Sequence, residues 1–431
     1  PLPSARQTQE SGEDHGDTLA TIIFTSGSTG RPKGIGYSYA QLTLAVDAVV
    51  DAFPEIDSSK TTVCWLPLSN LFQRIVNLCA LRGGASTYFV SDAQKLMQSL
   101  PEVRPTFLIG VPRFYEKIYA GIHSKLERMP LVFRGPIMFL LGHSDNAGLL
   151  GRLDRRLTRM LFGPVRKAFG GRVEFLVSGS APMPVWLLRS FDAMGLPVLE
   201  AYGLSENIVP ISVNRVADFR HGSVGKPLEP NELVVAEDGE LLCRGPGVCR
   251  RYFGDEQAVQ IDEDGLLATG DYAEIDSDGF VWLKGRKSDI FKTNTGRRIS
   301  PVEIEDHVRQ SGMVDHAVAV GAGRKFVVVL VTVAGWDEAR PEVDQLEQLR
   351  QSVSRSVGGL PKHKRPVGML VMRRAFSPLT GELTANLKLK RKIIETKLEA
   401  EIDALYRALD SVDWKGSAMI SYNATTYLVR L

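Results

Sequence analysis

The stretch Thr25-Ser26-Gly27-Ser28-Thr29-Gly30-Arg31-Pro32-Lys33-Gly34 decides how the rest of the chain is interpreted. A β-branched run at residues 19–24 precedes it, and apolar residues at helical spacing follow from Tyr37 to Phe53. We therefore expect a strand, a loop at 25–34 and a helix. Hydroxyls, cations and unobstructed backbone N–H groups on such a loop can bind phosphate oxygens. The stretch predicts a triphosphate site.

The loop differs from the Walker phosphate loop in two positions. Counted from Gly27, that pattern requires Gly where Pro32 stands, and Ser or Thr where Gly34 stands. The alternative to a phosphate site is a flexible Ser/Gly turn that binds nothing.

Short apolar runs alternate with helical periodicity as far as about residue 201. Expected strands lie at 62–66, 86–89, 107–111, 173–177 and 198–201, and expected helices at 70–82, 91–99, 112–169 and 184–194. This alternation predicts an α/β fold with a mostly parallel, covered sheet. From about residue 222, Asp-Gly pairs at 238–239, 264–265 and 278–279 predict the hairpins of a small antiparallel β subdomain.

A third texture begins near Gly285. Ser300-Pro301-Val302-Glu303 predicts a helix start with a capping box, and strands at 314–321, 325–333 and 367–373 with helices at 341–356 and 388–408 indicate a small α+β domain. The expected organisation is 1–18 linker or frayed terminus, 19–221 α/β part, 222–284 β subdomain, 285–410 C-terminal domain and 411–431 unassigned tail.

Composition excludes several classes of protein. The 431 residues carry 52 Lys plus Arg and 50 Asp plus Glu, and this net charge of +2 does not favour nucleic acid or an anionic membrane as the main partner. The four cysteines form no C-x-x-C pair, and no apolar run approaches the length of a membrane span, so we expect a cytoplasmic protein. The chain begins at Pro1 without an initiator Met, which suggests a start within a longer gene product.

Five motifs, in one order, resemble the adenylate-forming (AMP-binding) superfamily. Residues 25–34 resemble its phosphate-binding loop, Leu199–Asn207 its Tyr-Gly-x-Thr-Glu motif, and Thr269-Gly270-Asp271 its Thr-Gly-Asp. Gly285-Arg286, Gly296 and residues 301–305 are similar to the segment that opens its mobile C-terminal domain. Residues 381–391 resemble the C-terminal lysine motif of long-chain fatty acyl-CoA synthetases. The resemblance spans residues 19–408 and implies a large α/β N-terminal domain followed by a small, mobile α+β C-terminal domain.

The resemblance implies a role for each matching residue. ATP would be bound by the loop residues and by residues of four further segments: Thr25, Ser26, Gly27, Ser28, Thr29, Gly30, Lys33, Ser180, Ala181, Tyr202, Gly203, Asp271 and Arg286. Glu206 would hold Mg²⁺, which prefers carboxylate oxygens, and Ser205 keeps the hydroxyl of the family's Thr. Lys388 would be the catalytic cation, with Lys390 as the alternative register, and Ser288 would be the hinge. Core packing is the alternative for Tyr202, a surface position for Glu206 and Arg286, and turn chemistry for Asp271.

The implied reaction converts a fatty, long-chain carboxylic acid to acyl-AMP with ATP and Mg²⁺, then transfers the acyl group to CoA. A carrier protein is the alternative acceptor, and peripheral membrane association fits a lipid substrate. Three departures from the family pattern matter: only 24 residues precede Thr25, Asn70 and Gln73 replace His and Glu, and Ser288 replaces Asp or Lys. They motivate a second class, a catalytically incomplete nucleotide- or acyl-binding protein. The basic run 388–397 motivates a weaker third, a nucleic-acid binder.

Overall fold

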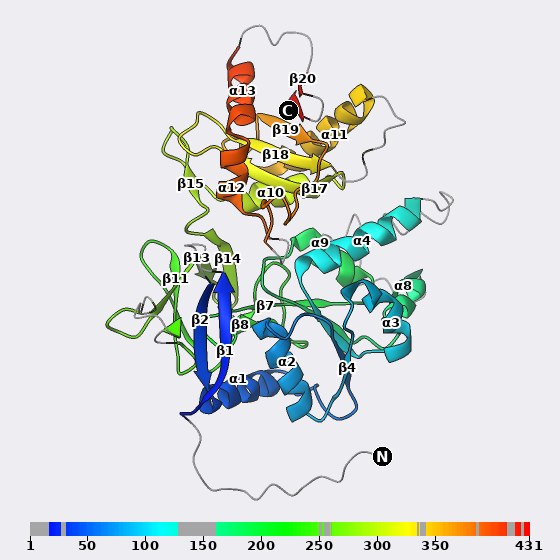
Figure 1. Ribbon diagram of the computed structural model, residues 1–431, viewed down its shortest axis with the longest axis vertical. Helices are drawn as coiled ribbons and strands as arrows, with labels where there is room; N and C mark the ends of the chain where they lie inside the picture. The colour runs from blue at the N-terminus through cyan, green and yellow to red at the C-terminus, as the bar shows by residue number, and fades with distance from the viewer. Residues whose placement is uncertain are drawn as a thin grey trace, which may run out of the picture. The chain divides into compact units, whose positions relative to one another are not determined.

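The computed structural model describes residues 17–26, 32–127, 161–249, 252–253, 259, 261–333, 336, 342–384, 388–411, 419–423 and 426–431. The chain divides into two compact units (Figure 1). The first unit comprises residues 1–269 and 274–282, and the second comprises residues 270–273 and 283–431.

The segment around the phosphate-loop motif is a β-hairpin, which corrects the expected strand–loop–helix order. β1 (Leu19–Ser26) pairs antiparallel with β2 (Pro32–Ser38), whose other edge pairs with β12 (Tyr252–Phe253). The following helix, α1 (Tyr39–Ala52), begins two residues later than expected because Ser38 and Gln41 form a capping box at its start. Ile35 and Tyr37 are fully buried on either side of Gly36, which is strand periodicity. The tip, residues 27–31, lies outside the described residues.

The central sheet of the first unit has the order β5-β6-β7-β8-β9. Its strands β5 (Phe107–Gly110), β6 (Phe175–Ser178) and β7 (Val198–Tyr202) are parallel, and β8 (Ser212–Val213) and β9 (Lys226–Pro227) continue it antiparallel. A separate parallel pair joins β3 (Thr61–Cys64) to β4 (Ser86–Phe89). The predicted α/β class is confirmed.

Helices cover both faces of this sheet. One face packs against α1 and α2 (Leu71–Arg82), and the other packs against α3 (Leu96–Val103), which follows the short η1 (Ala93–Lys95), and against α4 (Pro112–Glu127), α8 (Gly163–Ala168) and α9 (Val185–Ala193). Phe107 and Ile109 of β5 belong to the core under α1 and α2, whereas Leu108 belongs to the core under α3, α4 and α9. Alternate side chains of one strand thus serve opposite faces. Most of the single helix expected at 112–169 falls at residues 128–160, outside the described residues.

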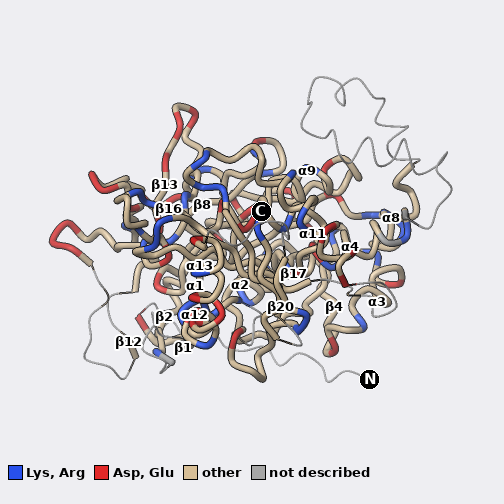
Figure 2. The backbone as a smooth tube through the Cα atoms, turned by 90° about the horizontal axis from the view of Figure 1, so that it is seen from above, with Lys and Arg blue, Asp and Glu red and all other residues tan. Residues whose placement is uncertain are grey.

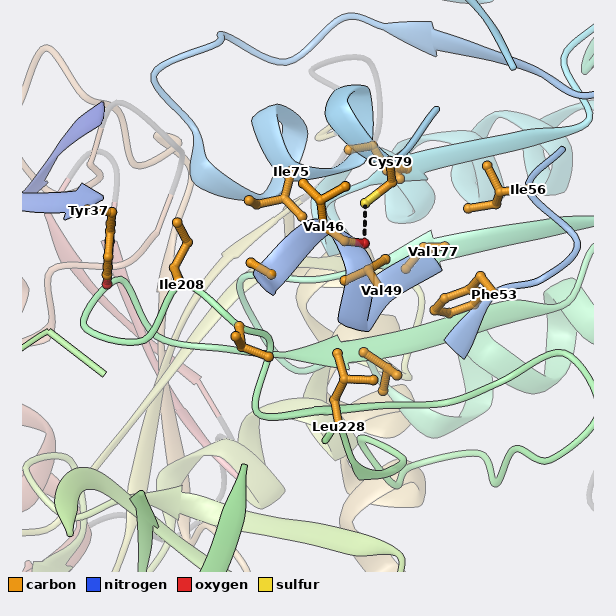
Figure 3. Packing of buried hydrophobic residues seen from close by; sticks show 14 of the residues in the cluster. Tyr37, Val46, Val49, Phe53, Ile56, Ile75, Cys79, Val177, Ile208 and Leu228 are labelled. Carbon is orange, nitrogen blue, oxygen red and sulfur yellow. Dashed lines mark hydrogen bonds between the residues drawn. The ribbon is translucent and has the colours of Figure 1, made fainter. Parts of the chain in front are cut away.

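The core between α1 and α2 is drawn in Figure 3. Val46 and Val49 of α1 lie against Ile75 and Cys79 of α2, with Val177 of β6 nearby. The Cys79 thiol donates a hydrogen bond to the Val46 carbonyl oxygen over 3.8 Å. Burial raises the pKa of this thiol to about 12, so it is an inert core group.

The Asp-Gly pairs lie at turns, as expected. β10 (Glu232–Val235), β11 (Glu240–Arg244), β13 (Leu267–Ile275) and β14 (Val281–Arg286) form a four-stranded sheet in that order. Gly239, Gly265 and Gly279 have φ between 79° and 92°, the left-handed region in which a Cβ atom is strained.

The second unit is built on a five-stranded sheet of order β17-β18-β19-β21-β20. Its elements are β15 (Phe291–Lys292), β16 (Arg298–Ile299), α10 (Pro301–Arg309), β17 (Val314–Val320), β18 (Val328–Val333), α11 (Glu342–Ser356), η2 (Val357–Gly359), β19 (Gly368–Met372), α12 (Arg391–Lys397), α13 (Glu399–Asp410), β20 (Met419–Asn423) and β21 (Thr426–Arg430). Val329 and Val331 face the core with α10 and α11, and Val328 and Leu330 face the core with α12 and α13. Helices therefore cover both faces here too.

Two expectations for this unit were wrong. The helix expected at 388–408 begins at Arg391 and is interrupted at Leu398, which separates α12 from α13. The capping box at Ser300 is absent: its hydroxyl donates to the Lys284 carbonyl oxygen over 2.9 Å, and the Glu303 carboxylate instead pairs with Lys364 at 2.5 Å. Both side chains of the motif have longer-range partners.

The tail at 411–431, to which no role was assigned, supplies the last two strands of the sheet. β21 pairs antiparallel with β19 in a register that sets Leu428 opposite Leu370. Tyr427, Leu428 and Val429 are buried. The tail is therefore part of the core of the second unit.

Candidate active site

The carboxyl ends of β6 and β7 carry four of the predicted ATP-binding residues. Ser180 and Ala181 follow β6, whereas Tyr202 ends β7 and Gly203 follows it. Ser180 has φ 71°, an unusual backbone conformation for a residue with a side chain, and such conformations cluster at functional sites. Open α/β sheets bind ligands at this edge. Tyr202 is only 9% exposed, so much of its ring also serves packing.

The loop after β6 is fastened to β7. The Met183 N–H donates to Glu200 Oε1 over 3.0 Å, and Glu200 is buried in β7. The buried Glu200 carboxylate therefore holds the loop that carries Ser180 against β7, the strand that ends just before Gly203.

The loop with Ser205 and Glu206 is held between β2 and the segment before β12. The Tyr37 hydroxyl of β2 donates to the Ser205 carbonyl oxygen, and the Cys249 N–H donates to the Glu206 carbonyl oxygen over 2.8 Å. Burial, with the nearby Cys249, Glu206 and Tyr252, raises the pKa of Tyr37, so its hydroxyl stays a donor. The phosphate-loop hairpin and the predicted metal ligand are thereby tied together.

Tyr252 brings the phosphate-loop lysine and the predicted metal ligand to one place. Its hydroxyl lies 3.4 Å from Glu206 Oε1 and donates to it, and Lys33 Nζ lies 4.5 Å from the centre of its ring. A cation over an aromatic face is attracted by the ring quadrupole. Sequence reasoning did not find Tyr252, because its contact with this site depends on β12 pairing with the distant β2. Its only signal is an aromatic pair, Tyr252-Phe253.

Only the two ends of the phosphate-loop motif lie among the described residues. Gly27, Ser28, Thr29 and Gly30 lie outside the described residues. Thr25 and Ser26 end β1, where their backbones pair with Lys33 and Pro32. The hairpin thus fixes both ends of the motif.

Within the second unit, Asp271, Arg286 and Lys388 come together. Asp271 on β13 is 6% exposed, and its Oδ1 lies 3.4 Å from Nε of Arg286 at the end of β14. The Lys287 N–H donates to the Gly270 carbonyl oxygen over 2.8 Å, which fixes the two strand segments beside each other. A carboxylate and a guanidinium in this arrangement can bind sugar hydroxyls and phosphate oxygens.

Charge and burial both act on Lys388. Its side chain keeps contact with solvent, yet surrounding protein desolvates the ammonium and lowers its pKa. The Arg286 guanidinium lowers the pKa further, whereas the Asp271 carboxylate raises it. Lys388 is therefore the lysine of the motif that lies beside the predicted ATP-binding residues Asp271 and Arg286. Lys390, the alternative, is the N-cap residue of α12.

The residues that depart from the family pattern at positions 70, 73 and 288 have local structural roles. Asn70 is the N-cap of α2 and accepts from the N–H groups of Phe72 and Gln73. The fully buried Gln73 amide accepts from Trp65 N and Leu66 N and donates to Asn77 Oδ1. Ser288 lies on the turn after β14, where its hydroxyl donates to Asp289 Oδ1 over 3.0 Å.

Charged residues of both signs are interspersed along the described chain, including α12 (Figure 2). Arg391, part of the basic run 388–397, is bound to the carboxylate of Glu305. Within the described part of the chain, no helix combines the length and apolarity needed to cross a lipid bilayer.

These features define a nucleotide-binding α/β enzyme, and comparison with known proteins places it. The profile of the AMP-binding enzyme family matches residues 2–253, and that of the AMP-binding enzyme C-terminal domain matches residues 288–410. The chain belongs to the AMP-binding enzyme family. The predicted resemblance is confirmed, and ATP is the nucleotide that the family uses.

Named relatives support this family assignment, and a solved structure supports the fold. The chain is 29% identical over 417 residues to long-chain-fatty-acid–CoA ligase FadD15 of Mycobacterium tuberculosis, covering 90% of this chain and 69% of that protein. It is 26% identical to human long-chain-fatty-acid–CoA ligase ACSBG2, covering 94% and 69%. The crystal structure of anthranilate CoA ligase AuaEII in complex with anthranoyl-AMP superposes with a TM-score of 0.69 at 22% identity, covering 91% and 70%, which supports the fold.

Proposed function

We propose that the protein is an acid–thiol ligase that activates a fatty, long-chain carboxylic acid as acyl-AMP and transfers the acyl group to CoA. The observation that carries the proposal is Lys388 beside Asp271 and Arg286, in a family member whose named relatives are long-chain-fatty-acid–CoA ligases. The lysine motif Gly381–Arg391 also favours the long-chain branch.

In the first half-reaction, a carboxylate oxygen attacks the α-phosphorus of ATP, and the bond to the β-phosphate oxygen breaks to release pyrophosphate. Negative charge spreads over the phosphate oxygens as this happens. Lys388 and Lys33 would neutralise that charge, and Asp271 with Arg286 would hold the ribose. The protein contributes position and electrostatics, and no protein nucleophile is required.

The donor set near Lys33 suits Mg²⁺. Glu206 supplies a half-buried carboxylate that accepts from Tyr252, and a hard cation prefers such an oxygen, with waters and phosphate oxygens as its other ligands. Bound there, Mg²⁺ would neutralise charge on the triphosphate. Tyr252 and Ser205 would orient this carboxylate and the adjacent phosphate.

In the second half-reaction, the CoA sulfur attacks the acyl carbonyl carbon, AMP leaves with the bonding electrons, and the thiol proton is released. We assign 19–221 and 222–284 to the N-terminal domain and 285–410, together with the tail strands β20 and β21, to the C-terminal domain, with Ser288 as the hinge between two working positions. Such rotations fall in the μs–ms range.

The direct test is carboxylate-dependent exchange of labelled pyrophosphate into ATP, screened over fatty acids of increasing length and aromatic acids. We expect specificity to rise with length until the acyl site is filled, by up to about 0.8 kcal/mol per methylene. A preference for acetate or benzoate would contradict the long-chain assignment. Offering CoA and a holo carrier protein in parallel and measuring thioester decides the acceptor. Absence of exchange with every acid would favour a binding protein.

A further inference from the structure

Lys388 lies in the loop 383–389, whose described ends are joined to each other. Leu383 and Leu389 form an antiparallel bridge, and the Lys390 N–H donates to the Glu382 carbonyl oxygen over 2.8 Å. The Thr384 N–H donates to the Lys388 carbonyl oxygen over 2.8 Å, while Thr384 Oγ1 accepts from the Lys388 N–H over 3.0 Å. The loop therefore has a defined base, and a shift of that base moves Lys388.

The first strand of this base is fixed by Glu382, whose side chain is 1% exposed. Arg374 donates two hydrogen bonds to its carboxylate, from Nη2 to Oε1 over 2.6 Å and from Nη1 to Oε2 over 3.0 Å. Thr380 Oγ1 donates a third, to Oε2 over 2.7 Å. Burial alone would raise the pKa of Glu382, but the bonds from Arg374 and Thr380 outweigh it and lower the pKa. The buried carboxylate is therefore held as an anion.

The far end of the loop is fixed by Arg391, the first residue of α12. Its Nη2 lies 2.5 Å from Glu305 Oε2, and Nη1 donates to Oε1. Glu305, on α10, is 5% exposed and also accepts from the Ala319 N–H over 2.8 Å. Arg391 Nε lies 3.5 Å from Asp289 Oδ2, in the turn that follows Ser288. This pair thus links the loop to α10 and to the predicted hinge.

Buried ion pairs are seldom a net source of stability, because desolvating two charges offsets their attraction; their best-attested use is to specify one conformation. Two arginine–carboxylate pairs flank one short loop here, and in each the carboxylate is buried, while the Arg374 side chain is 43% exposed and that of Arg391 is 17% exposed. Both pairs use the planar, two-pronged arginine geometry that fixes direction as well as distance.

We propose that Arg374–Glu382 and Arg391–Glu305 are positioning pairs that hold Lys388 beside Asp271 and Arg286, and that Arg391 couples this loop to the hinge turn. This inference rests on the proposed function for its catalytic meaning only. The placement of Lys388 can be measured without catalysis.

The test compares full-length Glu382→Gln and Arg391→Lys with Glu347→Gln, a matched control. Glu347 also receives two bonds from an arginine, Arg350, but lies on α11 away from the loop. The first measurement is the pH dependence of acetylation of Lys388 by acetic anhydride, quantified by mass spectrometry. In the parent and in Glu347→Gln, Lys388 should titrate at its lowered pKa. In Glu382→Gln the midpoint should move up towards that of an ordinary lysine, because the ammonium is less desolvated and no longer faces Arg286.

The second measurement separates the half-reactions. Glu382→Gln should slow pyrophosphate exchange by roughly 10–100-fold, the scale of a misplacement of about 1 Å, mainly in kcat. It should leave thioester formation from supplied acyl-adenylate within about twofold, since that pair touches only the loop. Arg391→Lys keeps the positive charge but loses the two-pronged guanidinium geometry. Because Arg391 also contacts Asp289 in the hinge turn, this variant should slow both half-reactions.

Unchanged acetylation midpoints in both loop variants would overturn the proposal, as would equal losses in Glu347→Gln. Thermal unfolding of each variant identifies loss through misfolding, and the acetylation experiment is then run below the transition. If the parent catalyses no exchange, the proposed function fails, while the acetylation profiles still decide whether the pairs place Lys388.

Discussion

The hydroxyl of Tyr252 lies 3.4 Å from Oε1 of Glu206, and the same ring lies 4.5 Å beneath Nζ of Lys33. One side chain thus contacts both the residue proposed to hold Mg²⁺ and the lysine of the phosphate-loop motif. It does so because β12 pairs with β2, which sets Tyr252 opposite Ile35.

Tyr252→Phe should weaken the use of Mg²⁺ and ATP while sparing the fold. The change removes one hydrogen bond to a carboxylate and keeps the ring under Lys33. At about 1–2 kcal/mol for such a bond, the apparent KM for MgATP should rise roughly 5–30-fold. The rise in apparent KM is measured by following the rate of pyrophosphate exchange as Mg²⁺ is added at a fixed ATP concentration. Tyr422→Phe, on the exposed β20, is the control and should match the parent.

The tail strand β21 should be necessary for the second unit. Leu428 is 4% exposed and packs in the core with α12 and α13, so Leu428→Ala should lower the free energy of unfolding by about 2–5 kcal/mol. Ile420, on the edge strand β20, is 41% exposed, and Ile420→Ala should cost much less. Urea unfolding followed by intrinsic fluorescence compares the two. Equal effects would show that β21 does not belong to the cooperative core.

Elements with strong local signals could be predicted from sequence. The parallel strands β5, β6 and β7 are apolar runs, and the Asp-Gly turns need a left-handed glycine, so both were found. β2 was missed because Gly34 and Gly36 interrupt its apolar pattern, and its strand character comes from pairing on both edges. β21 was missed because only its partner β19 shows why residues 426–429 are buried.

The site followed the same division. Motifs in the sequence named Asp271, Arg286 and Lys388, and the fold brings these three side chains together, while their roles stay predictions. Tyr252 and Glu305 were not named as site residues, because each contacts a partner distant in the chain. Arg374 was not named because no motif includes it, although its partner Glu382 is only eight residues away. Ser300 and Glu303 show the converse. The capping box that their spacing predicts does not form, because Ser300 bonds to Lys284 and Glu303 pairs with Lys364 instead.

The Arg374–Glu382 pair should make stability depend on acidity. The pKa of Glu382 in the folded protein is lower than the ordinary glutamate value of 4.5, so the folded state favours the ionised form. The stabilisation is present above pH 4.5 and is lost as the pH falls through the lowered pKa. The difference in unfolding free energy between the parent and Glu382→Gln should therefore be constant near neutrality and shrink below pH 4.5. A difference that grows on acidification would contradict the assignment.

The pH dependence of adenylation should report on Lys388. Burial and the Arg286 guanidinium lower the pKa of this ammonium below the ordinary 10.5, against the opposing effect of Asp271. Because only the charged form stabilises the developing negative charge, kcat/KM for ATP in pyrophosphate exchange should fall on the alkaline side at a pH below 10.5.

Lys388→Arg should abolish this fall within the accessible range, since guanidinium stays charged, although its absolute rate will be lower. Arg286→Gln removes a like charge and should move the fall to higher pH. Lys390→Arg is the matched control and should leave the profile unchanged. A profile that responds to Lys390→Arg but not to Lys388→Arg would transfer the catalytic role to Lys390.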